Sequence, residues 1–309
     1  MSRVLVTGSS GLLGGYVVAA LAGEAEVEAW TEVTGLDARP PPEATAARLA
    51  RHVEGSILDL DGLSAAAQGM DAIVHVAAAA NIHAGPPERI LELNAMGTWR
   101  VLEAARLAGV RRVVLCSTDS VMGNTVWQDH LWLPERLPVD EDHPLAPADP
   151  YGLSKLMAEQ AGRAYARRGL RVIALRPVFI LFPSMTGEVR ARHADPAGYR
   201  GPCAGGHAPA GGGFLWHHVD PRDVAEAFRL ALRCDADGFE VFYLSAPSTL
   251  HPTPTLDRIA EVLGRLPEQV DRARFEANPF APLFDTRRAE ARLGWRARHD
   301  HRRLVHAAP

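Results

Sequence analysis

Residues 4–14 have the sequence Val4-Leu5-Val6-Thr7-Gly8-Ser9-Ser10-Gly11-Leu12-Leu13-Gly14, and they carry the clearest sign of the architecture. The apolar residues at the start predict a buried strand, and the apolar positions from Leu12 to Leu21 recur at helical spacing. A glycine turn between a strand and a helix lets the backbone approach a pyrophosphate, to which the helix N-terminus presents free N–H groups. The glycines are spaced three and three, which departs from the usual G-x-G-x-x-G pattern. The stretch therefore predicts a dinucleotide site rather than a structural turn.

An acidic residue that binds the adenosine ribose is expected about 20 residues beyond such glycines. The run Val33-Thr34-Gly35-Leu36-Asp37 fits a second strand, and Asp37 lies 37 − 14 = 23 positions beyond Gly14. A carboxylate there accepts hydrogen bonds from ribose hydroxyls and repels a 2′-phosphate, which favours NAD, whereas the nearby Arg39 keeps NADP open. A second register would end this strand at Thr31 or Glu32.

Three further strands are expected along the chain, in residues 53–59 with their exit, 72–76 and 111–116. The last of them is followed by Ser117 and Thr118. Because ligands bind at the carboxyl ends of strands in open parallel sheets, these hydroxyls lie where a ligand would bind. The alternative is that they only cap the next segment.

The stretch Tyr151-Gly152-Leu153-Ser154-Lys155 holds the only lysine, since 32 of the 33 basic residues are arginine. A helix that starts near Pro150 would place Tyr151 and Lys155 on one face. An ammonium beside a phenol lowers the pKa of the phenol from its usual value of about 10, and arginine cannot relay a proton. The pair therefore indicates proton chemistry, with an exposed helix start and an incidental lysine as the alternative.

Composition excludes several classes of function. A net charge of −4 with no basic run argues against nucleic acid as a partner. The longest apolar-rich run, residues 72–80, is much shorter than the ~18 residues that a membrane span needs, and no signal peptide is expected. The three cysteines lie far apart, and His217 and His218 would point to opposite faces of a strand. We therefore expect no metal site, no disulfide framework and no membrane contact, and a cytoplasmic location.

These motifs, in this order, resemble the extended short-chain dehydrogenases/reductases, the family that includes NAD-dependent sugar epimerases, dehydratases and reductases. The resemblance runs from Val4 to about Ala231, with a weaker similarity from Phe284 to Trp295. The matching pieces are the Thr7-to-Gly14 loop, Gly55-Ser56-Ile57, His75-Val76-Ala77-Ala78, Asn94 with Gly97-Thr98, Ser117-Thr118 with Val121-Met122-Gly123, and Tyr151 with Lys155.

The resemblance implies an α/β fold, a Rossmann-type doubly wound parallel sheet with a small, interleaved C-terminal substrate domain. Residues 1–178 would form the dinucleotide-binding domain, rejoined by about 214–246. Residues 179–213 and 247–309 would form a substrate-binding cap.

The family's scheme also implies a role for each polar residue of the site. Tyr151 would be the acid/base, and Lys155 would hold the nicotinamide ribose and lower the pKa of Tyr151. Thr118 would hydrogen-bond the reacting oxygen, and Asn94 would support a water relay behind the lysine. The residues expected to bind the cofactor are Gly8, Gly11, Leu12, Leu13, Gly14, Asp37, Ser56, Ile57, Val76, Ala77, Ala78, Asn94, Tyr151, Lys155, Pro177 and Val178.

Departures from the family pattern bear on the substrate. Met122 stands where many sugar-nucleotide members have an aromatic residue, and Phe179 stands where they have an asparagine near the diphosphate. Phenylalanine cannot donate a hydrogen bond to phosphate, which makes a nucleotide sugar less favoured. Ser56 replaces an aspartate that faces adenine in many relatives. The residues expected to contact substrate are Ser120, Met122, Trp127 and Phe179.

Three functions are compatible with these residues. The first is an oxidoreductase that transfers a hydride between nicotinamide and a secondary alcohol or ketone of a sugar-like substrate. The second is a sugar or nucleotide-sugar epimerase or dehydratase that recycles its cofactor within one turnover. The third, disfavoured by the Tyr151 and Lys155 pair, is a non-enzymatic nucleotide sensor. A homodimer is an expectation from the family, and residues 185–213, rich in Gly, Pro, Arg and His, could form a flap over the pocket or a plain loop.

Overall fold

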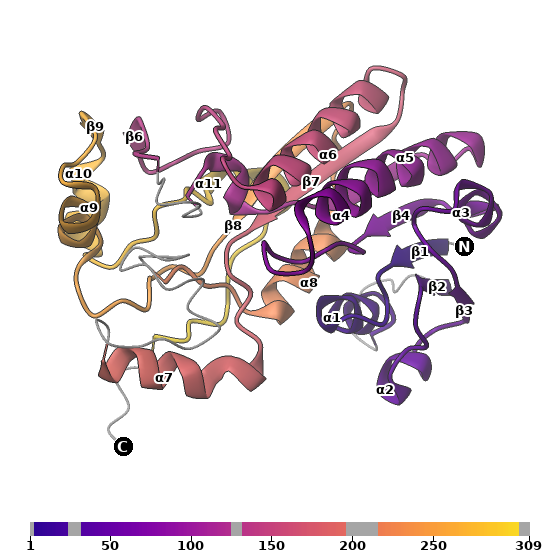
Figure 1. The fold of residues 1–309 in the computed structure, drawn as a ribbon, viewed down its shortest axis with the longest axis horizontal. Helices are drawn as coiled ribbons and strands as arrows, with labels where there is room; N and C mark the ends of the chain where they lie inside the picture. The colour runs from indigo at the N-terminus through magenta and orange to yellow at the C-terminus, as the bar shows by residue number, and fades with distance from the viewer. Residues whose placement is uncertain (1–2, 24–31, 125–131, 196–215, 303–309) are drawn as a thin grey trace.

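The computed structural model describes residues 3–23, 32–124, 132–195 and 216–302, and a seven-stranded parallel sheet forms its centre (Figure 1). In spatial order, the strands are β3 (Arg51–Glu54), β2 (Glu32–Asp37), β1 (Arg3–Thr7), β4 (Ala72–His75), β5 (Arg112–Cys116), β7 (Arg171–Pro177) and β8 (Phe239–Leu244). The chain first builds the sheet to one side of β1 and then to the other. This order confirms the doubly wound Rossmann-type sheet, whose ligand crevice lies outside the carboxyl ends of β1 and β4.

Helices cover both faces of the sheet because its strands are apolar on both sides. Along β1, Val4 and Val6 belong to one hydrophobic cluster and Leu5 belongs to the other. The helices on the Val4 side are α1 (Leu12–Leu21), α8 (Pro221–Ala231) and α11 (Arg287–Leu293). Those on the Leu5 side are α3 (Leu60–Ala67), α5 (Gly97–Leu107) and α6 (Pro150–Ala166). Figure 1 shows α5 and α6 on one face of the sheet, with α1 and α8 on the other.

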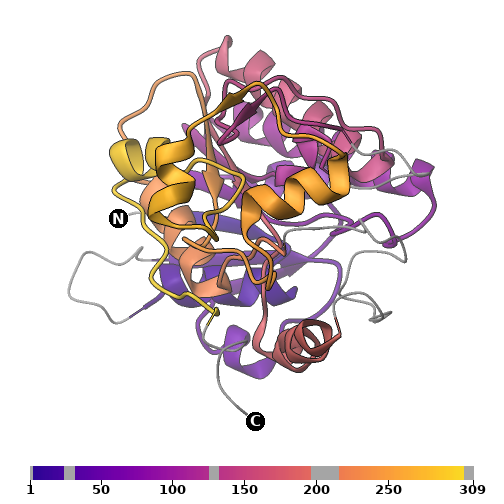
Figure 2. The same ribbon diagram turned by 90° about the vertical axis from the view of Figure 1, so that its left-hand side faces the viewer.

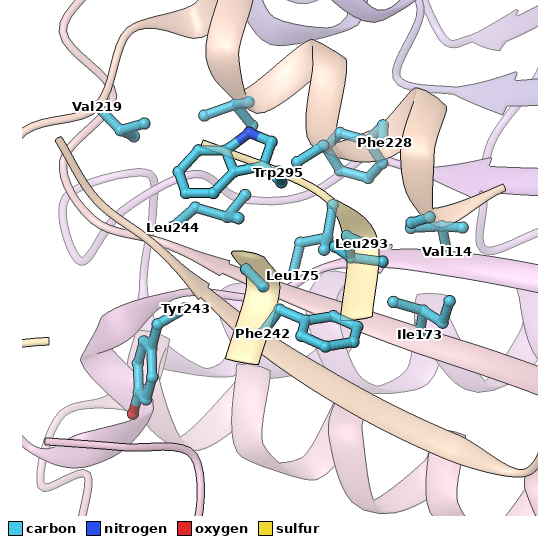
Figure 3. Packing of buried hydrophobic residues seen from close by; sticks show 14 of the residues in the cluster. Val114, Ile173, Leu175, Val219, Phe228, Phe242, Tyr243, Leu244, Leu293 and Trp295 are labelled. Carbon is cyan, nitrogen blue, oxygen red and sulfur yellow. The ribbon is translucent and has the colours of Figure 1, made fainter. Parts of the chain in front are cut away.

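The C-terminal part of the chain completes the core on the Val4 side (Figure 3). Trp295 follows α11, is 1% exposed, and donates from its Nε1 to the carbonyl oxygen of Asp223 at 2.7 Å. Leu293 of α11 packs in the same cluster as Leu175 of β7 and Phe242 of β8. The end of the chain is therefore part of the packing of the sheet.

A second group of elements lies on the side of the molecule opposite β3 (Figures 1 and 2). It comprises α7 (Thr186–Ala194), α9 (Thr255–Leu263), α10 (Arg272–Ala277) and the short parallel pair β6 (Arg136–Leu137) and β9 (Gln269–Val270). The remaining short elements are α2 (Glu43–Ala46), α4 (Pro87–Leu91), the π-helical turn η1 (Glu92–Met96), and the 3₁₀ turns η2 (Asp119–Met122) and η3 (Pro183–Met185). No helix in these ranges is both long and apolar enough to cross a membrane.

Two segments differ from the sequence-based expectations. His217 and His218 were expected to lie on a strand, but the described part of this segment, residues 216–220, makes only one bridge, between Ile180 and Val219. Trp216 has a φ of +52°, which a strand does not allow. In the segment 185–213, taken as a flap or a plain loop, residues 186–194 form the helix α7, and residues 196–213 lie outside the described ranges.

Candidate functional site

The glycine turn after β1 is shaped by close backbone contacts. Gly8 has a φ of +76°, and a Cβ atom there would lie 2.5 Å from the backbone nitrogen of Ala77. A Cβ atom on Gly14 would lie 2.0 Å from the carbonyl oxygen of Gly8. No side chain caps α1 at Gly11, and the hydroxyl of Ser9 is buried without a hydrogen-bond partner among the described residues. A turn this tight, with a helix N-terminus left uncapped, fits a pyrophosphate.

Asp37 closes β2, in agreement with the first of the two registers. Its Oδ2 accepts a hydrogen bond from the Ser10 backbone nitrogen at 3.1 Å, and its Oδ1 accepts one from the Arg39 backbone nitrogen at 3.1 Å. The bond from Ser10 ties the carboxylate to the glycine turn. A ribose that follows a pyrophosphate on that turn would therefore lie within reach of Asp37.

Asn94 lies in the π-helical turn η1, a distortion often found at functional sites. Its Oδ1 accepts from the Ala79 backbone nitrogen at 2.7 Å, and its Nδ2 donates to the Ala79 carbonyl at 3.0 Å and to the Ser154 hydroxyl at 3.0 Å. Asn94 thus links the loop after β4 to Ser154 of α6, the residue that precedes Lys155. Its part in a water relay stays a prediction.

His75 closes β4 and is held between two hydroxyls. Its Nδ1 lies 2.7 Å from Oγ1 of Thr7, and its Nε2 lies 3.0 Å from Oγ1 of Thr98. The Thr98 hydroxyl donates to the Asn94 carbonyl, so its oxygen is free to accept from Nε2–H. Burial, with a smaller effect of the Lys155 charge, lowers the pKa of His75 to about 3. His75 is therefore neutral near pH 7 and joins β1, β4 and α5.

The structure brings Tyr151, Lys155 and Thr118 together at the carboxyl end of β5. The helix α6 begins at Pro150, as expected, and Asp149 caps it by accepting from the Gly152 backbone nitrogen at 2.8 Å. Lys155 Nζ lies 5.9 Å from the centre of the Tyr151 ring and donates to the Cys116 carbonyl at 2.8 Å. The Tyr151 hydroxyl shares a hydrogen bond with Thr118.

The expectation that Lys155 lowers the pKa of Tyr151 is wrong in this structure. Burial raises the pKa of Tyr151, and the hydrogen bond with Thr118 offsets only part of that effect. Burial also lowers the pKa of Lys155, whose Nζ donates to Cys116 rather than to the phenol. Tyr151 therefore carries its proton near neutral pH.

Asp119 is a residue of the site that sequence reasoning did not single out. Its Oδ1 accepts from the Thr118 hydroxyl at 3.1 Å, and its Oδ2 accepts from Asn124 Nδ2 at 2.8 Å. Burial raises the pKa of this carboxyl to about 6, although both hydrogen bonds act against the rise. Its position next to Thr118 in the sequence was the available signal, but its surroundings depend on how η2 folds back on the strand end.

The other residues predicted to bind the cofactor lie at or just after the carboxyl ends of strands or, for Leu12 and Leu13, at the start of α1. Ile57 is buried after β3, and a Cβ atom on Gly97 would lie 2.6 Å from its Cδ1. Ser56 beside it is exposed, and its hydroxyl accepts from the Leu58 backbone nitrogen at 3.1 Å. The remaining members are Leu12 and Leu13 at the start of α1, Val76, Ala77 and Ala78 after β4, and Pro177 and Val178 at the end of β7.

The residues predicted to contact substrate are less uniform in their placement. Ser120 is half-buried in η2, whereas Met122 in the same turn is 1% exposed and belongs to the hydrophobic core. Phe179 follows β7 and is 41% exposed, so its ring is available to a ligand. Trp127 lies outside the described residues. Contact of these residues with substrate stays a prediction.

The histidine pair His217 and His218 serves packing in the described structure. His217 Nε2 accepts from the Leu283 backbone nitrogen at 3.0 Å, and His218 Nε2 accepts from the His301 backbone nitrogen at 3.1 Å. Among the described residues, no group of three or more His, Cys, Asp or Glu could hold a metal ion.

A cavity of about 480 Å³ lies at β6 and β9 rather than beside Tyr151, and its two arginines, Arg136 and Arg287, are paired with aspartates.

Comparison with known proteins agrees with this geometry. The chain is 35% identical over 191 residues to L-arabinose 1-dehydrogenase (NAD(P)(+)) of Haloferax volcanii, an alignment that covers 59% of this chain and 68% of that one. It is 31% identical over 259 residues to UDP-glucose 4-epimerase of Streptomyces lividans, covering 75% of this chain and 71% of that one. A dTDP-glucose 4,6-dehydratase of Streptomyces niveus is 34% identical over 186 residues, which span 56% of this chain and 52% of the dehydratase.

Solved structures give the same result over the whole chain. A dTDP-glucose 4,6-dehydratase from Streptomyces venezuelae with bound NAD superposes with a TM-score of 0.69 and 28% identity, covering 98% of this chain and 96% of that one. A short-chain dehydrogenase/reductase superfamily protein from Agrobacterium tumefaciens with bound NAD gives 0.69 and 27%, covering 98% and 95%. The model of the NAD dependent epimerase/dehydratase family matches residues 4–242. The chain therefore belongs to the NAD dependent epimerase/dehydratase family of enzymes.

Proposed function

We propose that this protein is an NAD-dependent oxidoreductase that transfers a hydride between the nicotinamide and a secondary alcohol or ketone of a sugar-like substrate. The observation that carries the proposal is the meeting of Tyr151, Lys155 and Thr118 at the carboxyl end of β5. The bound cofactor would supply or accept the hydride, and the residues around it bind, orient and move protons.

The residues that would hold the cofactor run along one edge of the sheet. The glycine turn would receive the pyrophosphate, Asp37 the adenosine ribose, and Lys155 the nicotinamide ribose. The Asp37 carboxylate favours NAD because it repels a 2′-phosphate, and the exposed Arg39 keeps NADP as the second choice. Comparing turnover with NAD and with NADP distinguishes the two.

Tyr151 would act as the acid/base. Because burial keeps its proton in place, the phenol is ready to protonate a carbonyl oxygen that lies against Thr118. The reverse direction needs the tyrosinate, which a positive charge brought beside the ring would favour. Positioned acid/base catalysis of this kind contributes about 10²–10⁴-fold to the rate.

The experiment is a panel of sugars and polyols assayed for net formation or loss of NADH, with the wild type, Tyr151→Phe and Lys155→Ala. We expect one substrate class to give net NADH formation and both variants to lose about 10²-fold or more of kcat. Unchanged turnover in Lys155→Ala would contradict the proposal, because the reaction would then not need Lys155 to hold the nicotinamide ribose. Tyr165→Phe is a control on the same helix, since the Tyr165 hydroxyl donates a hydrogen bond to Glu103 and lies outside the proposed site.

A second candidate, a dehydratase with internal cofactor recycling, is favoured by Asp119. Loss of water needs a second proton donor beside Tyr151, and a carboxyl with a pKa of about 6 can serve as one near neutral pH. This candidate predicts product formation without net NADH. It also predicts that Asp119→Asn abolishes water loss while cofactor binding persists.

A homodimer is also part of our proposal. Four exposed apolar side chains lie on the neighbouring elements η1, α5 and α6, namely Met96, Trp99, Leu153 and Met157. A second copy of the chain would cover this surface, with α6 of each copy bringing the Tyr151 helix to the interface. Light scattering tests the proposal, since Met157→Glu should shift a dimer toward a monomer, and a wild-type monomer would exclude the dimer.

A further inference from the structure

A fully buried ion pair lies one turn beyond Lys155, on the face of α6 that carries Tyr151 and Lys155. Glu159 is 1% exposed and Arg176 of β7 is 0% exposed. Arg176 donates to Glu159 through Nε at 2.8 Å and through Nη2 at 2.7 Å. A buried pair of this kind is costly to desolvate and is weak evidence for stability alone, so its position calls for another explanation.

Glu159 also reaches the strand end that carries the proposed catalytic hydroxyl. Its Oε1 accepts from the Ser117 hydroxyl at 2.6 Å, and Ser117 stands between Cys116 and Thr118. One turn earlier on α6, Lys155 Nζ donates to the Cys116 carbonyl. Two side chains on one helix face therefore hold two consecutive residues, Cys116 at the end of β5 and Ser117 directly after it.

We infer that Glu159 is a positioning residue: from beneath the site, it fixes α6 against the end of β5 so that Lys155 and Thr118 keep their places beside Tyr151. Glu159 touches neither Tyr151 nor the Thr118 side chain in the described structure, so it acts through Ser117 and through its charge beside Lys155. The inference rests on the proposed function for its catalytic consequence, but the placement of Lys155 can be tested without substrate.

The charge of Glu159 acts on the ammonium directly. Burial lowers the pKa of Lys155, whereas Cys116 and Glu159 raise it. The titratable or charged groups that face Lys155 are Cys116 of β5, Tyr151 and Glu159 of α6, and His75 of β4. His75 is neutral above pH 4 or so because its pKa is about 3, so Glu159 is the carboxylate among them.

The experiment uses the fact that Lys155 is the only lysine of the chain. Protein labelled with ¹³C at lysine Cε gives a single lysine resonance, and its pH titration reports the Lys155 ammonium without cofactor or substrate. We expect Glu159→Gln to move the titration midpoint downward by about half a pH unit or more. An unchanged midpoint would overturn the inference.

Glu103→Gln is a matched control for the loss of a bound carboxylate. Glu103 also accepts two hydrogen bonds from one arginine, Arg106, and one from a hydroxyl of α6, that of Tyr165. This control should leave the lysine midpoint in place. If Glu159→Gln alone fails to fold because Arg176 is left unpaired, the double variant Glu159→Gln with Arg176→Gln removes both charges. It should still move the midpoint downward, and a wild-type midpoint in the double variant would equally contradict the inference.

Turnover separates this inference from the proposed function. Glu159→Gln should lower kcat with little change in the KM for substrate, because Glu159 contacts no ligand position, and the pH profile of kcat should move with the lysine midpoint. If Lys155→Ala keeps full turnover, the proposed function fails whatever Glu159 does. If Lys155→Ala is inactive and Glu159→Gln leaves both the midpoint and the profile unchanged, only the present inference fails.

Discussion

The proposed site runs along the edge of the sheet formed by the carboxyl ends of its strands. The two ends of this site edge are built by different means. At the nucleotide end, the glycine turn is fixed by its own backbone, as in Gly14, whose missing Cβ leaves room for the Gly8 carbonyl. At the end that we propose for the substrate, beside Phe179, Trp216 has a φ of +52° and is followed by His217, whose ring accepts from Leu283, 66 residues away. A backbone constraint needs only a few neighbouring residues, whereas the substrate end depends on contacts between distant segments. The first kind of structure can be read from the sequence and the second cannot.

The largest effect is expected from Gly14→Ala at the nucleotide end. The new Cβ would lie 2.0 Å from the Gly8 carbonyl oxygen, so the turn must open and lose its fit to a pyrophosphate. We expect NAD affinity, measured by calorimetric titration, to fall by about 100-fold or more, because the backbone N–H groups of the turn and of the α1 N-terminus would no longer meet the pyrophosphate.

Gly187→Ala is the matched control, because Gly187 lies in α7 and a Cβ atom there would meet nothing within 4 Å. It should bind NAD as the wild type does. Equal NAD affinity in Gly14→Ala and Gly187→Ala would show that the turn does not receive the cofactor, and the contrast between the two ends would lose its basis.

Local patterns predicted the fold, including the turn after β1. The glycine spacing gave the β1–α1 turn, and apolar runs gave the strands on either side of it, with Asp37 at the end of β2. The direction of the Tyr151 pKa could not be predicted, because it depends on burial and on where Lys155 Nζ points. The buried carboxyl of Asp119 was missed for the same reason.

A smaller effect, the pH dependence of folding stability, distinguishes the two ends because a buried histidine lies at each of them. Burial lowers the pKa of His75 and of His217 to about 3 in each case. Both are neutral in the folded protein, whereas an unfolded histidine gains a proton near pH 6.5, so the unfolded state binds more protons between pH 6.5 and about 3. Stability is therefore fully present above pH 6.5 and falls as the pH is lowered through this window.

Denaturant unfolding at several pH values between 7 and 4 measures the slope, which should reach about 1.4 kcal/mol per pH unit for each histidine. His217→Gln should remove the part that comes from the substrate end, and His75→Gln the part from the nucleotide end. His83→Gln, at an exposed loop position, should leave the slope as it is. A slope that is the same in all four proteins would contradict the assignment to buried histidines.

The smallest effect is expected from Phe179→Asn, which sharpens the comparison at the substrate end. The Phe179 carbonyl accepts from the Val219 backbone nitrogen at 3.0 Å, so the backbone is held while the ring is 41% exposed. An asparagine there could donate a hydrogen bond to a diphosphate, and a bond to a charged group is worth about 1.5–3 kcal/mol. We expect UDP-glucose, titrated by calorimetry, to bind about tenfold more tightly to Phe179→Asn than to the wild type, and Phe179→Leu to bind it no better. Strong binding by the wild type, unchanged in both variants, would mean that Phe179 does not select against nucleotide sugars. Discrimination between substrates would then have to come from another part of the pocket.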